Sequence, residues 1–244
     1  MIQIFNPPAW HSAQHLATTM VQLETTAAVI TRAPMHTCPT VNWGFSNSLG
    51  TYILNEHIVG NKLRELQKLT DAGIPTIPFA KDRPAEHWLP RILHHKSGVD
   101  LRRYDALQQG RRRNLGFKPD FWVERLDVAH EFRLHVFNRK SIRAGIKVPN
   151  EEADRPPHPW IRSLKTGWKI DYGTVCQEML NRIKGIRQLA KDVIEVIDYD
   201  FGAVDIGTLT DGTRVVFEVN SAPGLDNDNT AFVYAKHIIE TIRE

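Results

Sequence analysis

Apolar residues recur along this chain with two different periods, and these predict helices and strands in turn. In residues 61–75 leucines recur at helical spacing, Asn61 precedes them as a candidate N-cap, and Gly73 ends the pattern. Residues 174–197 also follow helical spacing and begin with a capping-box pair of Thr and Gln, so they predict one long helix.

Several further segments alternate apolar and polar residues with the period of two that strands require. They are residues 120–126, 130–138, 141–148, 201–206 and 214–220. Residues 108–120 and 148–160 have the composition of surface connections. Hairpin strands mixed with amphipathic helices predict an α+β fold rather than a doubly wound parallel sheet.

The strand at residues 214–220 carries polar side chains at its end. Alternation places Val215, Phe217 and Val219 on one face and Val216, Glu218 and Asn220 on the other. Asp211 and Gly212 form a strong hairpin signal before it, and such a turn puts Asp205 directly opposite Glu218.

Two opposed carboxylates repel each other unless something neutralises them. Together with Asn220, Asp205 and Glu218 form a set of oxygen donors that suits Mg²⁺. Repulsion alone predicts that neutralising one carboxylate raises the stability of the metal-free protein. Solvation of both carboxylates on an exposed strand is the alternative, and the spacing by itself leaves both interpretations open.

A second predicted hairpin, with residues 138–140 as its connection, has one cationic face. That face carries Arg133, His135, Arg143 and Lys147, with Glu131 at its entrance. Its three permanent cations repel one another, and a polyphosphate offsets that repulsion through charge-assisted hydrogen bonds. A solvated basic face is again the alternative, but a carboxylate face and a cationic face in one chain suit a metal–nucleotide complex.

Composition restricts the class of protein. The chain has 244 residues, 41% of them hydrophobic and 24% charged, with a net charge of +3, which is too small to argue for nucleic acid. Cys38 and Cys176 form no disulfide framework, no apolar run approaches the roughly 20 residues of a membrane span, and no signal peptide is evident. We therefore expect a cytoplasmic protein.

Motifs in order along residues 60–235 resemble the ATP-grasp superfamily of carboxylate–amine ligases. "NKLRELQKLTDAGIPTIPF" is similar to the helix and strand that open the family's fold, and "WLPRILHHKSGVDLR" to its phosphate-binding strand and loop. "FWVERLDVAHEFRLHVF" resembles the adenine hinge and the strand after it, and "GAVDIG…VVFEVNSAPGL" the magnesium-binding pair. This last motif is the specific one.

The resemblance implies ATP and Mg²⁺ as cofactors and assigns roles by position. Asp205, Glu218 and Asn220 are the implied magnesium ligands. The implied adenine hinge is Val123, Glu124 and Leu126. Implied contacts to phosphate or to the reacting carboxylate come from Arg91, Lys96, Gly98, Arg133 and Lys147, with Arg133 as the catalytic residue.

The chain departs from the family pattern in three ways. Arg91 stands where the family has lysine, and Gly98 is the single glycine of a loop that often has several. The resemblance also implies three regions: a reduced N-terminal region over 1–60, a first lobe over 61–125 and a second lobe with the magnesium site over 126–244. With this short N-terminal region, the chain resembles the compact amidoligase-like ATP-grasp proteins found in phage genomes.

The activity that the resemblance implies is amide or peptide bond formation. ATP phosphorylates a substrate carboxylate, and an amine of a small molecule or peptide then displaces phosphate from the acyl phosphate. An ATP-binding regulator without turnover is the alternative, and a nucleic-acid-binding protein using residues 102–113 is a third. Within that stretch, Arg111, Arg112 and Arg113 either recruit a polyanion or are simply solvated. The sequence does not indicate the oligomeric state.

Overall fold

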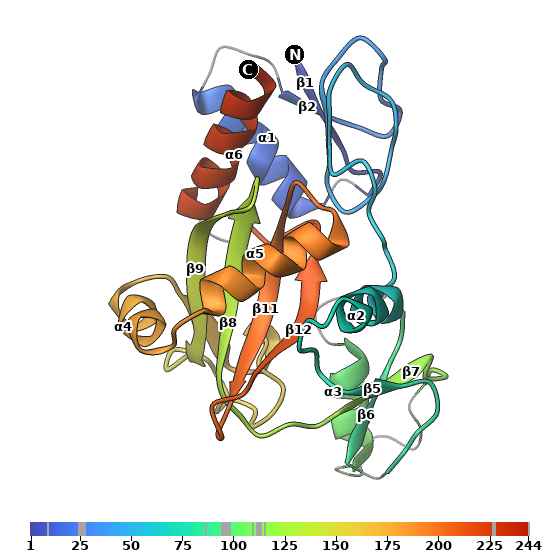
Figure 1. The fold of residues 1–244 in the computed structure, drawn as a ribbon, viewed down its shortest axis with the longest axis vertical. Helices are drawn as coiled ribbons and strands as arrows, with labels where there is room; N and C mark the ends of the chain where they lie inside the picture. The colour runs from blue at the N-terminus through green and yellow to red at the C-terminus, as the bar shows by residue number, and fades with distance from the viewer. Residues whose placement is uncertain are drawn as a thin grey trace.

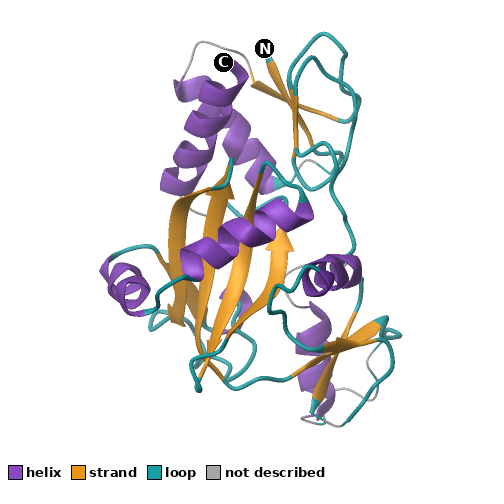
Figure 2. Ribbon diagram, viewed as in Figure 1, coloured by secondary structure: helices purple, strands orange, loops and turns teal. Residues whose placement is uncertain are grey.

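In the computed structural model, three sheets follow one another along the chain (Figures 1 and 2). The structure describes residues 1–8, 10–23, 28–85, 87–93, 99–108, 110, 114, 116–225 and 228–243. A four-stranded parallel sheet comes first, then a small three-stranded antiparallel sheet, then a five-stranded antiparallel sheet. The α+β class expected from the hairpins and helices is confirmed, whereas the division into domains stays a prediction.

The first sheet has the strand order β2-β1-β3-β4. Its strands are β1 (Ile2–Phe5), β2 (Ala28–Thr31), β3 (Thr40–Asn42) and β4 (Ile53–Leu54). Helix α1 (His11–Leu23) connects β1 to β2, and the C-terminal helix α6 (Asp228–Arg243) packs against α1. The last helix therefore shares a core with the first strands, around the buried side chains of Trp43 and Tyr234.

The second sheet has the order β5-β7-β6 and lies beside two helices. Its elements are β5 (Phe79–Ala80), β6 (Trp88–Arg91), β7 (Phe121–Glu124), α2 (Lys62–Asp71) and α3 (Val99–Gln108). The predicted start of α2 is confirmed, because the side chain of Asn61 accepts a hydrogen bond from the Arg64 amide at 3.1 Å. Gly73 follows the helix with φ of +76°, a conformation that glycine adopts without strain.

The third sheet has the order β10-β9-β8-β11-β12 and carries helices on one face (Figure 1). Its strands are β8 (Val128–Phe137), β9 (Lys140–Pro149), β10 (Trp168–Asp171), β11 (Phe201–Leu209) and β12 (Arg214–Asn220), with the 3-10 helix η1 (Leu164–Thr166) before β10. Helices α4 (Thr174–Arg182) and α5 (Ile186–Ile197) bury the apolar side of β8, β9, β11 and β12 in one core. The polar side of the same strands therefore faces away from α5.

The prediction of one helix over 174–197 is wrong. Gly185, with φ of +79°, separates α4 from α5, since this left-handed conformation cannot continue a helix. The predicted capping box is wrong as well, because Gly173 is the N-cap of α4. Asp171 takes the capping role from outside the helix and accepts a hydrogen bond from the Cys176 amide at 3.1 Å.

The connection of the β8–β9 hairpin is shorter than predicted. Lys140 pairs with Phe137, so the turn consists of Asn138 and Arg139 alone. Both turn residues have positive φ, 43° and 59°, as a tight hairpin turn of the primed type requires.

The β11–β12 ladder contains a bulge that the simple alternation missed. Near the turn Ile206 pairs with Val216, but Asp205 pairs with Glu218, so Phe217 is the extra residue. Val216 consequently joins Val219 in the core under α5, and its predicted place beside Glu218 is wrong. Phe217 lies on the polar side instead, where its ring covers Gly207: a Cβ at Gly207 would stand 2.4 Å from that ring.

No helix among the described residues is both long and apolar enough to cross a membrane. Cys38 and Cys176 are buried free thiols.

Candidate active site

Four neighbouring strands bring the predicted metal ligands and cations together. The ladder pairs Asp205 of β11 with Glu218 of β12 on one side and with Arg133 of β8 on the other. Asn220 pairs with Ala203, one step along the same face. The predicted opposition of Asp205 and Glu218 is confirmed, because the bulge restores the register at this point.

Asp205 and Arg133 form a buried, bidentate ion pair. Arg133 Nε and Nη2 donate to the two carboxylate oxygens of Asp205, each at 2.7 Å. Lys147 Nζ lies 3.5 Å from Asp205 Oδ2. Burial pushes the pKa of the Asp205 carboxyl upward, but the two cations outweigh burial and hold that pKa below its ordinary value. Asp205 is therefore ionised and fixed in position.

Lys147 is paired a second time, with Glu131. Its ammonium bonds Glu131 Oε1, and both side chains are largely buried. Burial raises the pKa of Glu131 above its ordinary value despite this contact, whereas Glu131 and Asp205 raise the pKa of Lys147 against the effect of burial. These carboxylates neutralise Lys147 without an external anion.

The expectation of mutually repelling cations is corrected by these pairs. Arg133 and Lys147 meet carboxylates, and the Arg143 guanidinium stacks 4.3 Å from the ring centroid of Tyr172. The sequence did not show that β11 lies between the cationic hairpin and Glu218, so it missed that Asp205 is the cations' partner.

Lys62 is a site residue that the sequence analysis missed. Its ammonium bonds the Val219 carbonyl and lies 3.3 Å from Glu65, and attraction to Glu65 and Glu218 raises its pKa although burial opposes this. Tyr199 in turn donates to Glu65 at 3.3 Å. The sequence does contain an indication of this role. A lysine in the first turn of a helix, such as Lys62, is unfavourable beside the positive end of the helix dipole, which predicts a nearby anion.

The donor set fits a magnesium ion. Asp205, Glu218 and Asn220 offer hard oxygen ligands of the kind that Mg²⁺ takes, with phosphate and water completing its octahedron. Asn220 Nδ2 donates to Glu218 Oε1 at 3.0 Å, which brings the two side chains together. Within the described residues no three His, Cys, Asp or Glu side chains converge on a metal position. The set therefore suits a cation shared with phosphate rather than one held by protein alone.

An apolar cluster adjoins the polar face and contains part of the predicted adenine hinge. Val123 is buried in it with Leu89, and Leu126 and Phe217 pack against it. The backbone of the hinge is fixed, since the Glu124 amide donates to the Pro78 carbonyl at 2.9 Å. Phe217 links this cluster to Glu218, its neighbour in the chain.

Arg91 lies apart from the ion-pair network, on the second sheet. Its Nε donates to Asp100 Oδ2 at 2.8 Å, and Asp100 is fully buried in the first turn of α3. The predicted phosphate contacts Lys96 and Gly98 lie outside the described residues, as do residues 111–113.

A buried histidine stands one ladder step from the ion pairs. Tyr234 donates to the Gly202 carbonyl at 3.1 Å, so in the 3.1 Å contact between His135 and Tyr234 the imidazole Nδ1 is the donor. The other ring nitrogen then accepts from Tyr172 at 3.2 Å. Burial, reinforced by Arg133, lowers the pKa of His135 to about 3, so the ring is neutral.

The turn after β12 is held from the N-terminal part of the chain. His15 Nδ1 donates to the Leu225 carbonyl at 2.6 Å, and His15 Nε2 lies 3.0 Å from Asp228. Gly44 leaves room for the Trp10 ring and for Ala222, which a Cβ at Gly44 would meet at 2.7 Å and 3.0 Å. His15 is therefore a positioning residue for the turn.

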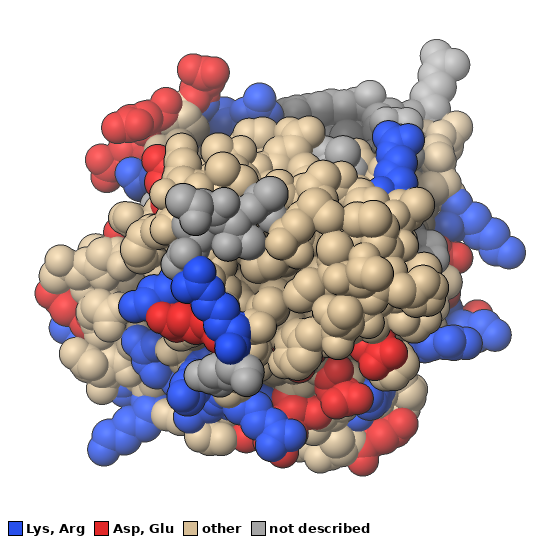
Figure 3. Space-filling model, turned by 90° about the horizontal axis from the view of Figure 1, so that it is seen from above, with Lys and Arg blue, Asp and Glu red and all other residues tan. Residues whose placement is uncertain are grey.

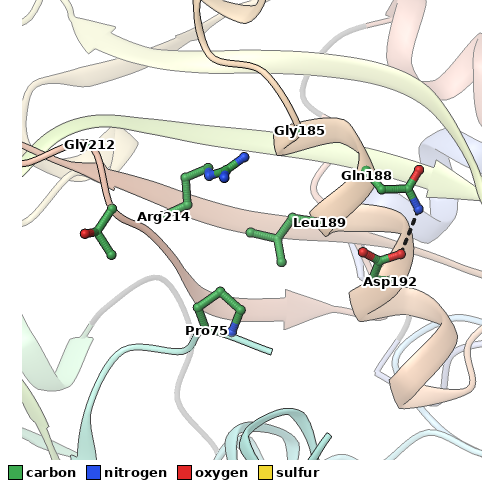
Figure 4. Close-up of a pocket in the computed structure, with 8 residues that line it drawn as sticks. Pro75, Gly185, Gln188, Leu189, Asp192, Gly212 and Arg214 are labelled. Carbon is green, nitrogen blue, oxygen red and sulfur yellow. Dashed lines mark hydrogen bonds between the residues drawn. The ribbon is translucent and has the colours of Figure 1, made fainter. Parts of the chain in front are cut away.

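A surface pocket of about 500 Å³ opens on the opposite side of the sheet (Figure 4). Pro75, Leu189 and Arg214 are among the residues that line it, and a 2.7 Å hydrogen bond joins Gln188 to Asp192 at its edge. None of the predicted site residues lines it, so it is separate from the candidate active site.

No protein-family model matches the sequence, and no curated protein sequence matches it. Solved structures do. The D-alanine–D-alanine ligase from Bacillus anthracis superposes with a TM-score of 0.65 at 11% identity, over 99% of this chain and 97% of that chain. D-cycloserine synthetase DcsG gives 0.63 at 12% identity, with 99% of each chain covered.

The ATP-grasp ligase PsnB, complexed with a variant precursor, Mg and ADP, gives a TM-score of 0.61 at 12% identity, over 99% of this chain and 98% of that chain. This chain has the ATP-grasp fold. The predicted resemblance is thereby confirmed for the fold. The third sheet carries Asp205, Glu218 and Asn220, and the second sheet carries Val123 and Glu124; their roles as magnesium ligands and adenine hinge stay predictions.

Proposed function

We propose that this ATP-grasp protein is an ATP-dependent carboxylate–amine ligase that releases ADP and phosphate. The convergence of Asp205, Glu218 and Asn220 with Arg133 and Lys147 on one sheet face carries the proposal. Lys62 of α2 adds a further cation, which bonds the Val219 carbonyl of β12. Such a face combines oxygen ligands for a cation with donors for phosphate. The ligases among the solved structures of the same fold support it further.

The base of ATP lies against the apolar cluster of Val123, Leu126 and Phe217, with hydrogen bonds to the backbone near Glu124. Arg133 and Lys147, near Glu218, would meet the phosphates of ATP. Asp205, Glu218 and Asn220 would hold a magnesium ion, which would supply positive charge to offset that of the phosphates.

Arg133 and Lys147 act as fixed donors. Because Asp205 and Glu131 hold them before substrate arrives, they need no reorganisation when negative charge develops on the transferred phosphoryl group. An oxygen of the substrate carboxylate attacks the terminal phosphorus, and the bond to ADP breaks. An amine then attacks the acyl carbon of the acyl phosphate, phosphate leaves, and the amine nitrogen loses a proton.

The region of the turn at residues 221–225 is the proposed acceptor site, since it follows Asn220 directly. We further propose that the substrate is a peptide or a small molecule. We also propose that the chain divides into a reduced N-terminal region (1–60), a first lobe (61–125) and a second lobe (126–244), as in a compact amidoligase-like protein. Its proposed location is the cytoplasm. The two buried free thiols suit a reducing compartment.

A regulator that binds ATP without turnover is the second candidate. The contact between Arg91 and buried Asp100 favours it, because an arginine already held by a carboxylate is a weaker phosphate donor than a free lysine.

ADP release with a panel of amino acids and short acidic peptides separates the two candidates. The ligase proposal predicts magnesium-dependent ADP release that needs both a carboxylate and an amine, with the amide product visible by mass spectrometry. Glu218→Gln should abolish the release, and Glu178→Gln on exposed α4 serves as the matched control. ATP binding without ADP release under any mixture would favour the regulator.

A further inference from the structure

Charged residues are distributed very unevenly along the chain. It has 31 Lys and Arg and 28 Asp and Glu residues, and two of these, Glu24 and Arg32, lie within residues 1–55. Helix α1 has two histidines but no Asp, Glu, Lys or Arg among its thirteen residues. An ordinary solvated surface carries many more charges, whereas the centre of a protein interface is depleted of them.

Exposed apolar side chains concentrate in the same region. Among the described residues eight large apolar side chains are exposed, and five of the eight lie within residues 1–55. These five are Met1, Val21, Val29, Met35 and Tyr52. Figure 3 looks down on the end of the molecule where β1, β2 and α1 lie, and uncharged side chains occupy most of its centre.

Strand β2 is an open edge of the first sheet. It pairs with β1 on one side and has no partner strand on the other among the described elements. The strand, AVIT, carries none of the charges, prolines or bulges that commonly protect an edge from pairing with another chain.

The direction of the free backbone groups follows from one hydrogen bond. The Thr31 carbonyl accepts from the Asn6 amide at 3.3 Å, so Thr31 faces the β1 side. Backbone groups alternate along a strand, which turns Val29 toward β1 as well and Ala28 and Ile30 toward the open edge.

We propose that β2 pairs with β2 of a second copy of this chain across a twofold axis, joining the two first sheets into one. A twofold axis makes this junction antiparallel, with Ala28 of one copy opposite Ile30 of the other. Val29 then meets Val29 of the second copy as a pair without mutual backbone hydrogen bonds, where Cβ atoms lie about 4.5–5.5 Å apart.

The charge pattern favours a second copy over a different partner. Arg32, directly after β2, is the one exposed Lys, Arg, Asp or Glu among the described residues within 1–55. A surface this poor in charges meets itself with little repulsion, as a self-complementary twofold contact requires, and it offers little to a charged partner. Because β2 has four residues, backbone bonds alone are few. The exposed Met1, Val21 and Met35 of the same N-terminal region offer further apolar surface for such a contact.

Two substitutions of Val29 test the pairing. Val29→Cys should form an intermolecular disulfide under mild oxidation, at least tenfold faster than Val175→Cys. Val175 is a comparably exposed valine on α4, 51% against 40%, and the native Cys38 and Cys176 are buried. Val29→Lys should convert a dimer into a monomer by light scattering at 10–100 µM, whereas Val175→Lys leaves the dimer intact. Circular dichroism should show both lysine variants folded.

A wild-type protein that is monomeric at 100 µM overturns the proposal, and the edge of β2 is then open to an extended segment of another protein. A dimer that survives Val29→Lys, or Val29→Cys that crosslinks no faster than Val175→Cys, overturns it too, because the contact then lies elsewhere. None of these measurements depends on ligase activity.

Discussion

Asp205→Asn should destabilise the protein in the absence of nucleotide and metal. The substitution removes the charge that Arg133 contacts through two 2.7 Å hydrogen bonds and that Lys147 approaches at 3.5 Å. Two unit charges about 4 Å apart attract by roughly 4 kcal/mol at an effective dielectric constant of about 20. Repulsion from Glu218 and Glu131 acts in the opposite direction.

The balance of these contributions is unfavourable, because a buried cation loses its partner. Breaking a buried ion pair from one side costs about 3–5 kcal/mol, and we expect a loss in this range. This reverses the expectation from the sequence, where repulsion between Asp205 and Glu218 alone predicted a gain in stability. Attraction between Arg133 and Asp205, which are far apart in the sequence, outweighs that repulsion.

Urea unfolding of the apo-protein at pH 7.5 measures the effect. Asp154→Asn, at an exposed carboxylate outside the sheets, is the matched control and should leave the midpoint unchanged. In a double-mutant cycle with Arg133→Gln, the coupling to Asp205→Asn should be about 1–3 kcal/mol. If Asp205→Asn were as stable as the wild type or more stable, the ion pair with Arg133 would not stabilise the apo-protein.

Three further predictions follow from the same face of the sheet. Arg133→Lys should keep ATP affinity within a few fold but lower kcat by roughly 10²-fold, because one ammonium cannot reproduce a bidentate guanidinium; an unchanged kcat would argue against a role at the reacting group. His135 has a pKa of about 3 in the fold against 6.5 for an ordinary histidine, so the unfolded chain binds the extra proton between these values, and stability falls as the pH drops below 6.5. His135→Gln should remove about 2 kcal/mol of the stability difference between pH 7 and pH 5, and equal pH dependence of both proteins would contradict the buried neutral ring. Gly207→Ala should displace the Phe217 ring, destabilise the fold by about 1–3 kcal/mol and raise the KM for ATP, which steady-state kinetics and urea unfolding check together.

Local patterns predicted the elements and the central pair of carboxylates well. Strand β12 has the predicted bounds, because strand alternation acts over a few residues. Asn61 caps α2 by an equally short-range contact. Both features depend on neighbours in the chain. Asp205 faces Glu218 as predicted, but the bulge at Phe217 rather than the turn alone brings them opposite each other.

Irregularities inside elements were not predictable from the same periodicity. Phe217 is an extra residue in the ladder, so Glu218 faces Asp205 while the residues nearer the turn pair in a register shifted by one. Gly185 lies within a segment of helical periodicity, yet its left-handed backbone separates α4 from α5. A single residue causes each irregularity, and a periodic pattern read over many residues does not reveal the effect of one.

Long-range neighbours were the largest gap. The strand order places β8 beside β11, so Arg133 meets a residue 72 positions away in sequence. Lys62 reaches Val219 across 157 positions. No local pattern specifies such contacts, so the sequence alone does not show that Asp205 pairs with the cations of β8 and β9.

Calorimetric titration of ATP with and without Mg²⁺ shows whether this sheet face binds metal and nucleotide together. We expect the wild type to bind ATP at least tenfold more weakly in EDTA. Glu218→Gln should lose the magnesium-dependent part of the affinity, Glu178→Gln should behave as the wild type, and circular dichroism should show all three proteins folded. Unchanged magnesium-dependent affinity in Glu218→Gln would contradict the assignment of this sheet face as the site of metal and nucleotide.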